Sequence, residues 1–434
     1  MSWESLSQYL LPAINYHAMH KKLLVIQVAA LGWELLRRHG KAAIAGLKFQ
    51  PAGGVFPALT CSAQAAFRTA QPAAVHGMIA NGLYFRPLHR TMFWEQSASL
   101  VEGSRIWDNF RSRGGKVSLL FWQQSLGENA DCILSPAPIH KHHGGMIQDC
   151  YSQPADLYPR LCRTIGRQFN LMHYWGPLAG AKVGEWIAEA TCRVLAVAPQ
   201  NHLCLTYLPS LDYDLQRHPQ DHPKNVKALQ RIGQQLEIVC SAARRNEYEI
   251  IVFGDYAIVD TAVGDAAVFP NRALRQAGLL ATRNVRGMVY SDFHAGKAMA
   301  MADHEIAHVY VKDSADIPRV RRVLEALPGV GQVLDRAAQA AAGIGHPNCG
   351  EFVLLAEPRR WMAYPWWQED ERGPDYAAHI DIHNKCGYDP CELFFGWPPG
   401  TVSRNTSRVR GSHGLVGPAG RSPGRRALNR RGRS

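Results

Sequence analysis

A small polar triplet, Thr60-Cys61-Ser62, stands immediately before a short run of helix-forming residues, 63–69. A hydroxyl at the first turn of a helix can cap free backbone N–H groups. It can also lie where those N–H groups and the helix dipole would hold an anion such as phosphate. Local features alone favour the helix-capping role. Only the rest of the chain can favour the anion-binding role instead.

Carboxylates and a histidine follow two apolar segments further along the chain. They are Asp212, Asp214 and His218 after residues 202–209, and Asp255 after residues 249–254. The two segments read as buried strands, and open α/β sheets bind ligands at the carboxyl ends of their strands. Two acids and a histidine directly after a buried strand are costly without a role. A plain polar loop is the alternative interpretation.

Another polar group, Asp303, His304 and His308, precedes a short apolar run. If the segment were helical, the two histidines would share a face, as zinc-binding pairs do. The apolar run Val309-Tyr310-Val311 instead indicates an extended segment, in which His304 and His308 lie on one face of a strand. His304 is a candidate for a metal or phosphate role.

The elements that would position these side chains are buried strands alternating with amphipathic helices. Continuous apolar runs predict strands at 23–30, 117–122, 202–209, 249–254 and 350–357. Apolar residues at helical spacing, or helix formers followed by a breaker, predict helices at 33–40, 183–198, 225–245 and 317–327. Residues 1–20 have no clear pattern and form a lead-in.

The stretch PALTCSAQAAFRTAQPAAVHGMIANGLYF, residues 57–85, resembles the nucleophile region of the nucleotide pyrophosphatase/phosphodiesterase family, in the alkaline phosphatase superfamily. In that family a P-x-x-T turn places a catalytic Thr at a helix start, and an HG segment with an Asn close behind completes the pattern. Thr60 falls on the nucleophile, and Asn81 is the implied substrate-binding residue together with His304. The resemblance therefore favours the phosphate-facing interpretation of Thr60.

The resemblance implies an α/β, alkaline-phosphatase-like domain over residues 21–400, with a central mostly parallel sheet, helices on both faces and inserted loops over the site. The implied reaction is hydrolysis of a phosphodiester or pyrophosphate bond in a small phosphorylated or nucleotide substrate. One or two divalent ions, most simply zinc, would activate the weakly nucleophilic Thr60 and stabilise the leaving oxygen.

The family pattern implies a set of metal ligands near the strand ends. The first is Asp212 or, in a register shifted by two, Asp214 together with His218. The others are Asp255 and His413, which is in the late Gly-Ser-His-Gly segment. His383 is the runner-up to His413. Three positions depart from the pattern. Gln27 replaces an Asp, Tyr256 replaces a His, and Gln216 replaces a His if Asp212 is the ligand. A non-catalytic or repurposed phosphate-binding member of the same fold is therefore the alternative function.

Composition bounds the remaining classes of function. The formal net charge is +12, but residues 401–434 hold nine Arg and no acidic residue, so 39 basic and 36 acidic residues remain in 1–400. A basic, Gly/Pro/Arg-rich tail that is unstructured explains this better than nucleic-acid binding.

Ten scattered Cys without a C-x-x-C pair indicate reduced thiols and a cytoplasmic protein. No apolar run is long enough to span a membrane. The histidines 140, 142 and 143 indicate an exposed loop.

Overall fold

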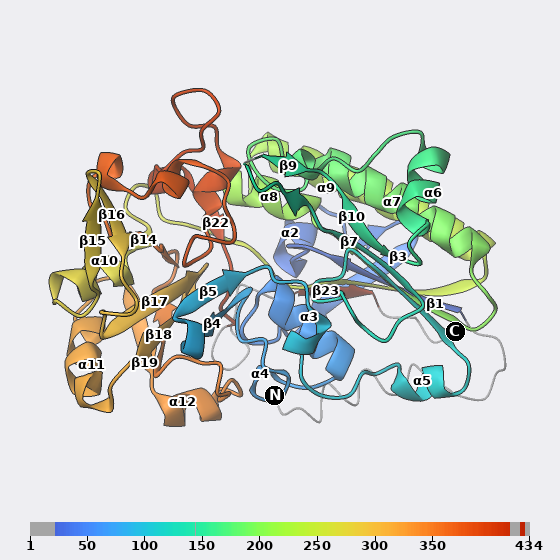
Figure 1. The fold of residues 1–434 in the computed structure, drawn as a ribbon. Helices are drawn as coiled ribbons and strands as arrows, with labels where there is room; N and C mark the ends of the chain where they lie inside the picture. The colour runs from blue at the N-terminus through green and yellow to red at the C-terminus, as the bar shows by residue number, and fades with distance from the viewer. Residues whose placement is uncertain (1–21, 144, 417–425, 430–434) are drawn as a thin grey trace.

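A nine-stranded sheet forms the centre of the molecule, with the strand order β10-β7-β6-β11-β1-β12-β23-β3-β2 (Figure 1). The computed structural model describes residues 22–143, 145–416 and 426–429, so the predicted lead-in at 1–20 lies outside the described residues. The five middle strands are parallel: β7 (Cys132–Pro136), β6 (Lys116–Leu120), β11 (His202–Leu208), β1 (Lys22–Val28) and β12 (Tyr248–Gly254). This mostly parallel sheet confirms the predicted fold class.

Short antiparallel strands flank the parallel centre on both sides. They are β10 (Cys150–Gln153) on one side, and β23 (Arg426–Asn429), β3 (Leu47–Ala52) and β2 (Ala43–Ile44) on the other. Every residue of β11 is buried, as expected for a strand covered on both faces. The apolar runs at 23–30 and 202–209 are continuous for the same reason.

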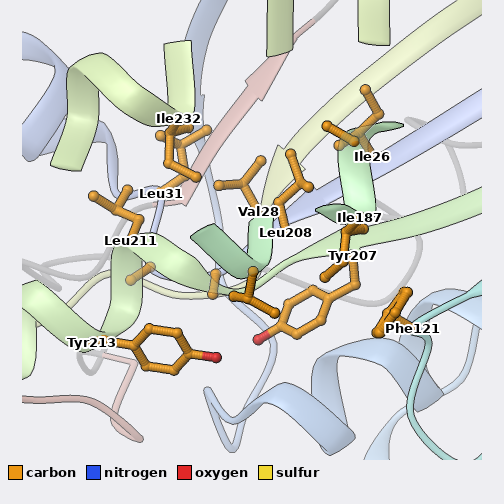
Figure 2. Packing of buried hydrophobic residues seen from close by; sticks show 14 of the residues in the cluster. Ile26, Val28, Leu31, Phe121, Ile187, Tyr207, Leu208, Leu211, Tyr213 and Ile232 are labelled. Carbon is orange, nitrogen blue, oxygen red and sulfur yellow. The ribbon is translucent and has the colours of Figure 1, made fainter. Parts of the chain in front are cut away.

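Helices cover both faces of this sheet (Figure 1). On one side lie α2 (Trp33–Arg38), α6 (Leu157–Ile165), α7 (Ala181–Val197), α8 (Ser210–Arg217) and α9 (Pro223–Arg245). On the other lie α3 (Thr60–Thr69), α4 (Ala73–His76) and α5 (Asp108–Ser112). Figure 2 shows apolar side chains of β1, β11, α7, α8 and α9 packed together, with the hydroxyls of Tyr207 and Tyr213 turned toward one another.

A second, four-stranded sheet lies beside the first, with the order β17-β18-β20-β19. Its strands are β17 (Ala298–Asp303), β18 (Ile306–Val311), β20 (Phe352–Ala356) and β19 (Val330–Leu334), packed with α10 (Pro270–Gln276), α11 (Ile317–Glu325) and α12 (Arg336–Ala341). The extended conformation predicted near His308 is confirmed, because β17 and β18 form a hairpin. His304 is in its turn, so it does not share a strand face with His308.

Shorter elements complete the described chain. They are the strands β4 (Gly82–Phe85), β5 (Arg90–Phe93), β8 (Ile139–His140), β9 (Met146–Ile147), β13 (Val259–Asp260), β14 (Ala267–Val268), β15 (Thr282–Val285), β16 (Met288–Ser291), β21 (Trp361–Met362) and β22 (Gly411–Ser412), and 3-10 helices that include η6 (Asp370–Arg372), η8 (Pro390–Leu393) and η9 (Thr406–Arg408). The histidines 140, 142 and 143 are exposed around the β8–β9 turn, as predicted. None of the helices in the described segments combines the length and the apolar character that crossing a bilayer requires.

The described part of the tail is folded, which corrects the prediction of an unstructured end at 401–434. Strand β22 pairs with β13, and β23 lies between β12 and β3 in the central sheet. Ala427 is fully buried, and its backbone N–H donates to the carbonyl of Leu31 at 3.0 Å. A four-residue strand with one Arg and one Asn carries too short an apolar pattern to be recognised from the sequence.

Candidate functional site

Thr60 is the first residue of α3, at the edge of the central sheet. The preceding Leu59 occupies the N-cap position and makes no side-chain cap, so Thr60 is not the cap that local features favoured. The next backbone N–H, that of Cys61, donates to Asn81 Oδ1 at 3.0 Å. One of the free N–H groups at the helix start is therefore already satisfied by the protein, and Thr60 itself is 4% exposed.

The Thr60 hydroxyl begins a short chain of hydrogen bonds. Its Oγ1 lies 3.3 Å from the hydroxyl of Tyr256, which donates to Asp212 Oδ1 at 3.0 Å. Because Tyr256 gives its proton to Asp212, Thr60 is the donor in the first contact. Tyr207, next to the end of β11, lies beside Thr60. Thr60, Tyr207 and Tyr256 are all buried.

Helix α8 decides which acid after β11 reaches this group. Asp212 and Gln216 are four residues apart on one helical face, and Gln216 Nε2 donates to Asp212 Oδ2. Asp214 is about 200° further round the helix, where it pairs with Arg217 at 3.7 Å. His218 stacks on His222, with ring centroids 4.3 Å apart. The structure thus gathers Asp212 with Thr60 and places Asp214 and His218 elsewhere.

Asp255 is at the carboxyl end of β12 and is fully buried. Its Oδ1 accepts the backbone N–H groups of Ala30 and Tyr256, each at 2.9 Å. Its Oδ2 accepts Gln27 Nε2 at 3.0 Å, because β1 and β12 are parallel neighbours with Gln27 opposite Phe253. Each carboxylate oxygen is thus held by N–H donors of the protein.

Four aromatic rings stack in a column beside Asp212. Centroid distances are 3.5 Å between Tyr256 and His413, 3.8 Å between His413 and His304, and 3.7 Å between His304 and Tyr388. His413 Nδ1 donates to the carbonyl of Ala58 at 2.7 Å, and its Nε2 is 3.9 Å from Asp212 Oδ1, too far for a hydrogen bond. Tyr388 closes the network by donating its hydroxyl to Gln216 Oε1 at 2.8 Å.

Asp303 joins the turn of the β17–β18 hairpin to the start of α3. Its Oδ2 accepts the backbone N–H of Asn81 at 2.7 Å, and its Oδ1 accepts Asn81 Nδ2 at 3.2 Å. His304 Nδ1 donates to the same Oδ1 at 2.7 Å. His308 points elsewhere and bonds to the carbonyl of Ile79 at 3.2 Å. His383, the runner-up for the late histidine, bonds to the carbonyl of Phe93 instead.

Burial dominates the electrostatics of the site. It raises the pKa of Asp212 to about 6, that of Asp255 to about 8 and that of Asp303 to about 6. It lowers the pKa of His304 and His413 well below the usual value, so both imidazoles are neutral near pH 7. Within the described ranges, none of the three acids forms an ion pair with Lys or Arg. The site therefore has carboxyl groups and no partner cation.

Residues 23–389 match the type I phosphodiesterase / nucleotide pyrophosphatase family. The chain belongs to this family. The resemblance seen in residues 57–85 is thereby confirmed over most of the chain. A comparison with curated proteins finds no match.

Solved structures with the same fold include phosphonoacetate hydrolase from Sinorhizobium meliloti 1021, determined with phosphonoformate and with phosphonoacetate. It is 14% identical, with a TM-score of 0.58, covering 94% of this chain and 89% of that one. Murine ectonucleotide pyrophosphatase/phosphodiesterase 5 is 14% identical, with a TM-score of 0.53, covering 91% and 88%; an inactive Thr-to-Ala variant of it was determined with AMP. At these identities the likeness establishes the fold alone, which is alkaline-phosphatase-like.

The side chains present do not fit the metal centre that the family implies. The structure's described residues include no cluster of three or more His, Cys, Asp and Glu side chains arranged to hold an ion. At the positions that depart from the family, Gln27 and Gln216 donate N–H groups to the acids that would bind metal, and Tyr256 fills the space beside His413 with a ring. The two Gln side chains offer neutral amides where carboxylate or imidazole ligands would be needed, so the acids keep fewer partners with which to share a cation.

Sequence reasoning missed two residues of this site, Tyr207 and Tyr388, and gave a third, Asp303, no role. Tyr207 lies inside a buried strand, where the sequence pattern predicts that a Tyr is a core residue. Tyr388 arrives from a late loop with no regular pattern, and only tertiary packing brings it onto His304. Asp303 was visible beside His304, but its bonds to Asn81 cross 222 residues of sequence.

Proposed function

We propose that this chain is a non-hydrolytic member of the type I phosphodiesterase / nucleotide pyrophosphatase family. The observation that carries the proposal is the pairing of Gln27 with Asp255 and of Gln216 with Asp212. In this arrangement each side-chain amide donates a hydrogen bond to a carboxylate oxygen. The ring of Tyr256 stacks on His413, and Tyr388 donates its hydroxyl to Gln216. The former catalytic region then serves as a hydrogen-bonded part of the core.

The chemistry of Thr60 supports this proposal. A threonine hydroxyl is a weak nucleophile and needs a base or a metal to activate it. Its partner Tyr256 has a pKa raised well above the usual value by burial, so it keeps its proton. A phosphoryl group beside Thr60 would also meet the carboxylate of Asp212, which forms no ion pair with a Lys or Arg of the described residues. Like charges in a buried site are strongly unfavourable.

The second candidate is the hydrolase that the family pattern implies. It is favoured by the meeting of Thr60, Asp212, Asp255 and His413, which come from four distant segments. In this candidate Thr60 attacks a small phosphorylated or nucleotide substrate, with Asn81 and His304 contacting it. The inactive Thr-to-Ala variant of the murine relative supports a functional threonine at such a site. In this candidate a zinc ion would have to be held by Asp212, Asp255 and His413 without the ligands that Gln27, Gln216 and Tyr256 replace.

The test is metal analysis of the purified chain after incubation with zinc, followed by assays on a chromogenic phosphodiester and on nucleotide pyrophosphates. We expect no stoichiometric zinc, no turnover above the buffer rate and a melting temperature that does not change with EDTA. Each of these follows from the replacement of three metal-ligand positions by Gln27, Gln216 and Tyr256, which donate to the remaining acids or fill the space beside them.

Two variants decide between the candidates if turnover is found. Thr60→Ala removes the hydroxyl at the helix start, whereas Ser62→Ala removes a buried hydroxyl from the same turn that has no hydrogen-bond partner in the described structure. Zinc-dependent turnover that is lost in Thr60→Ala and kept in Ser62→Ala would establish the hydrolase. Turnover that survives in both variants would point to a contaminating enzyme and leave the non-hydrolytic proposal standing.

A further inference from the structure

A loop between η8 and η9 projects from the body of the molecule, at the top of Figure 1. Its aromatic side chains face solvent: Trp397 is 84% exposed and Phe395 is 61% exposed. Residues 393–403 contain no charged side chain. Exposed aromatic side chains on an uncharged, projecting segment are typical of a contact surface.

Hydrogen bonds within the loop and at its base fix its shape. Phe395 and Val402 form an antiparallel bridge where the two arms of the loop meet. Near the tip, the backbone N–H and the hydroxyl of Thr401 both donate to the carbonyl of Pro398, at 3.2 and 2.7 Å. At the base, Arg408 Nη1 donates to the carbonyl of Phe395 at 2.9 Å. The loop is therefore ordered before a partner binds, which lowers the entropic cost of association.

A cavity of about 570 Å³ opens at the foot of this loop. Its lining includes Cys391 of η8 and, before and at the start of η9, the residues Arg404, Asn405 and Thr406. The two segments of chain that leave the cavity wall thus continue into the two arms of the loop. The volume of the cavity is within the range of small-molecule sites in proteins, and an indole ring is smaller than most ligands of such sites. The projecting loop and the cavity therefore adjoin each other.

The lining of the cavity carries charges of both signs. Arg272, Arg404 and Asp370 all line it, and Arg404 donates to the backbone carbonyl of Asp370. Burial lowers the pKa of Arg272, and the nearby carboxylate of Asp370 opposes that shift. A ligand with a net charge of either sign would therefore meet a like charge in the cavity. A neutral ring with an N–H group avoids this conflict, because a carboxylate can accept the N–H and a guanidinium can lie over the ring.

The side chain of Trp397 has this chemistry, and at 84% exposed it does not enter the cavity of its own chain. A second copy of the chain would bring another cavity to it. Because the loop and the cavity adjoin, a two-fold axis between them can pair each loop with the partner's cavity at the same time. We propose that two copies of the chain form such a dimer, with Trp397 of each copy inserted into the cavity of the other. The interface uses none of the residues around Thr60, so it goes beyond the proposed function and does not depend on it.

Sedimentation velocity of the full chain over a concentration series tests the dimer. We expect a monomer–dimer equilibrium, and Trp397→Ala should raise the dissociation constant of the dimer by at least about tenfold, as for a tryptophan at the centre of an interface. The matched control is Val197→Ala at the end of α7, which removes a side chain that is 78% exposed and should leave the constant unchanged. A chain that stays monomeric at every concentration, or equal effects of the two variants, would overturn the proposal.

A mixing experiment tests whether the loop enters the cavity. Gln368→Trp blocks the cavity at an exposed position of its lining and leaves Trp397 in place. This variant and Trp397→Ala should each dimerise weakly alone. Their equimolar mixture should associate more tightly, because it combines an intact Trp397 with an open cavity. If Gln368→Trp does not fold, as judged by circular dichroism, Thr406→Trp takes its place.

Two results of the mixing experiment and its companion assay would contradict the dimer. A mixture that associates no more tightly than either variant alone would show that the loop does not enter the cavity. Binding of a monomeric chain to vesicles of phosphatidylcholine and phosphatidylserine, lost in Trp397→Ala, would assign the loop to a lipid surface and overturn the proposal.

Discussion

Gln27 and Gln216 each donate a side-chain N–H to a buried carboxylate, that of Asp255 and that of Asp212 respectively. An amide and a carboxylate of similar size have opposite effects at such a position. The amide completes the hydrogen bonding of its acid, whereas a second carboxylate would repel it unless a cation lay between them. Single-residue chemistry at these positions thus determines how many metal ligands the site offers on the same backbone.

At this scale, the triple variant Gln27→Asp, Gln216→His and Tyr256→His should gain stoichiometric zinc binding. The changes remove the side-chain donors of both acids and add one carboxylate and two imidazoles, which are zinc ligands. Isothermal titration with zinc measures the gain. Gln27→Asp alone is the control: it should bind no zinc and should unfold at a lower temperature, because it replaces the amide that donates to Asp255 at 3.0 Å with a second carboxyl group. Equal zinc binding by the unmodified chain would contradict the prediction.

Among the elements, α8 sets which acid faces the site, and β23 connects two parts of the central sheet. The rotation of α8 selects Asp212 over Asp214, because residues two apart on a helix face different directions. Strand β23 joins the β2–β3 hairpin to the parallel part of the sheet, since β3 pairs with β23 and β23 pairs with β12.

A chain that ends after Val416 should therefore be less stable than one that ends after Asn429. The shorter chain loses the pairing of four residues of β23 with β3 and the hydrogen bond from Ala427 to Leu31. At about 0.5–1.5 kcal/mol per hydrogen bond, the free energy of unfolding should fall by a few kcal/mol. Urea denaturation of the two truncated chains measures the difference. Equal midpoints would show that β23 does not support the sheet.

At the scale of the whole molecule, several titratable groups of the described residues are buried without an ion pair. His202 is one that lies outside the site: its Nε2 is 2.7 Å from Ser118 Oγ, and its Nδ1 is 2.5 Å from the hydroxyl of Tyr248. Burial lowers its pKa to about 4. The unfolded chain binds a proton at this residue below about pH 6.5, while the folded chain does not until about pH 4. Its contribution to stability is therefore present above pH 6.5 and is lost as the pH falls.

Between about pH 6.5 and pH 4 the contribution of His202 to the free energy of unfolding should fall, and His202→Gln should remove that part of the pH dependence. One group of this kind contributes up to about 1.4 kcal/mol per pH unit. Urea denaturation over this pH range checks the slope, with the exposed His142→Gln as the control, which should keep the original slope. A slope that His202→Gln leaves unchanged would mean that His202 binds its proton in the folded chain as readily as in the unfolded one.

The sequence alone determined the features that depend on local pattern. Continuous apolar runs predicted β1, β6, β11 and β12, and helical spacing predicted α7 and α9, because burial imposes a period along the chain. The stretch around Thr60 identified the family for a similar reason: the turn, the helix start and the nearby Asn81 are close in sequence.

Only the tertiary structure decided how the side chains of the site meet. The position of Tyr388 on His304, the choice of Asp212 over Asp214 and the insertion of β23 into the sheet all depend on partners far away in the chain. The same holds for the pairing of Gln27 with Asp255, which are 228 residues apart. Local pattern fixes which face of an element is apolar, but the direction of a buried polar side chain depends on the donor or acceptor that packing brings to it.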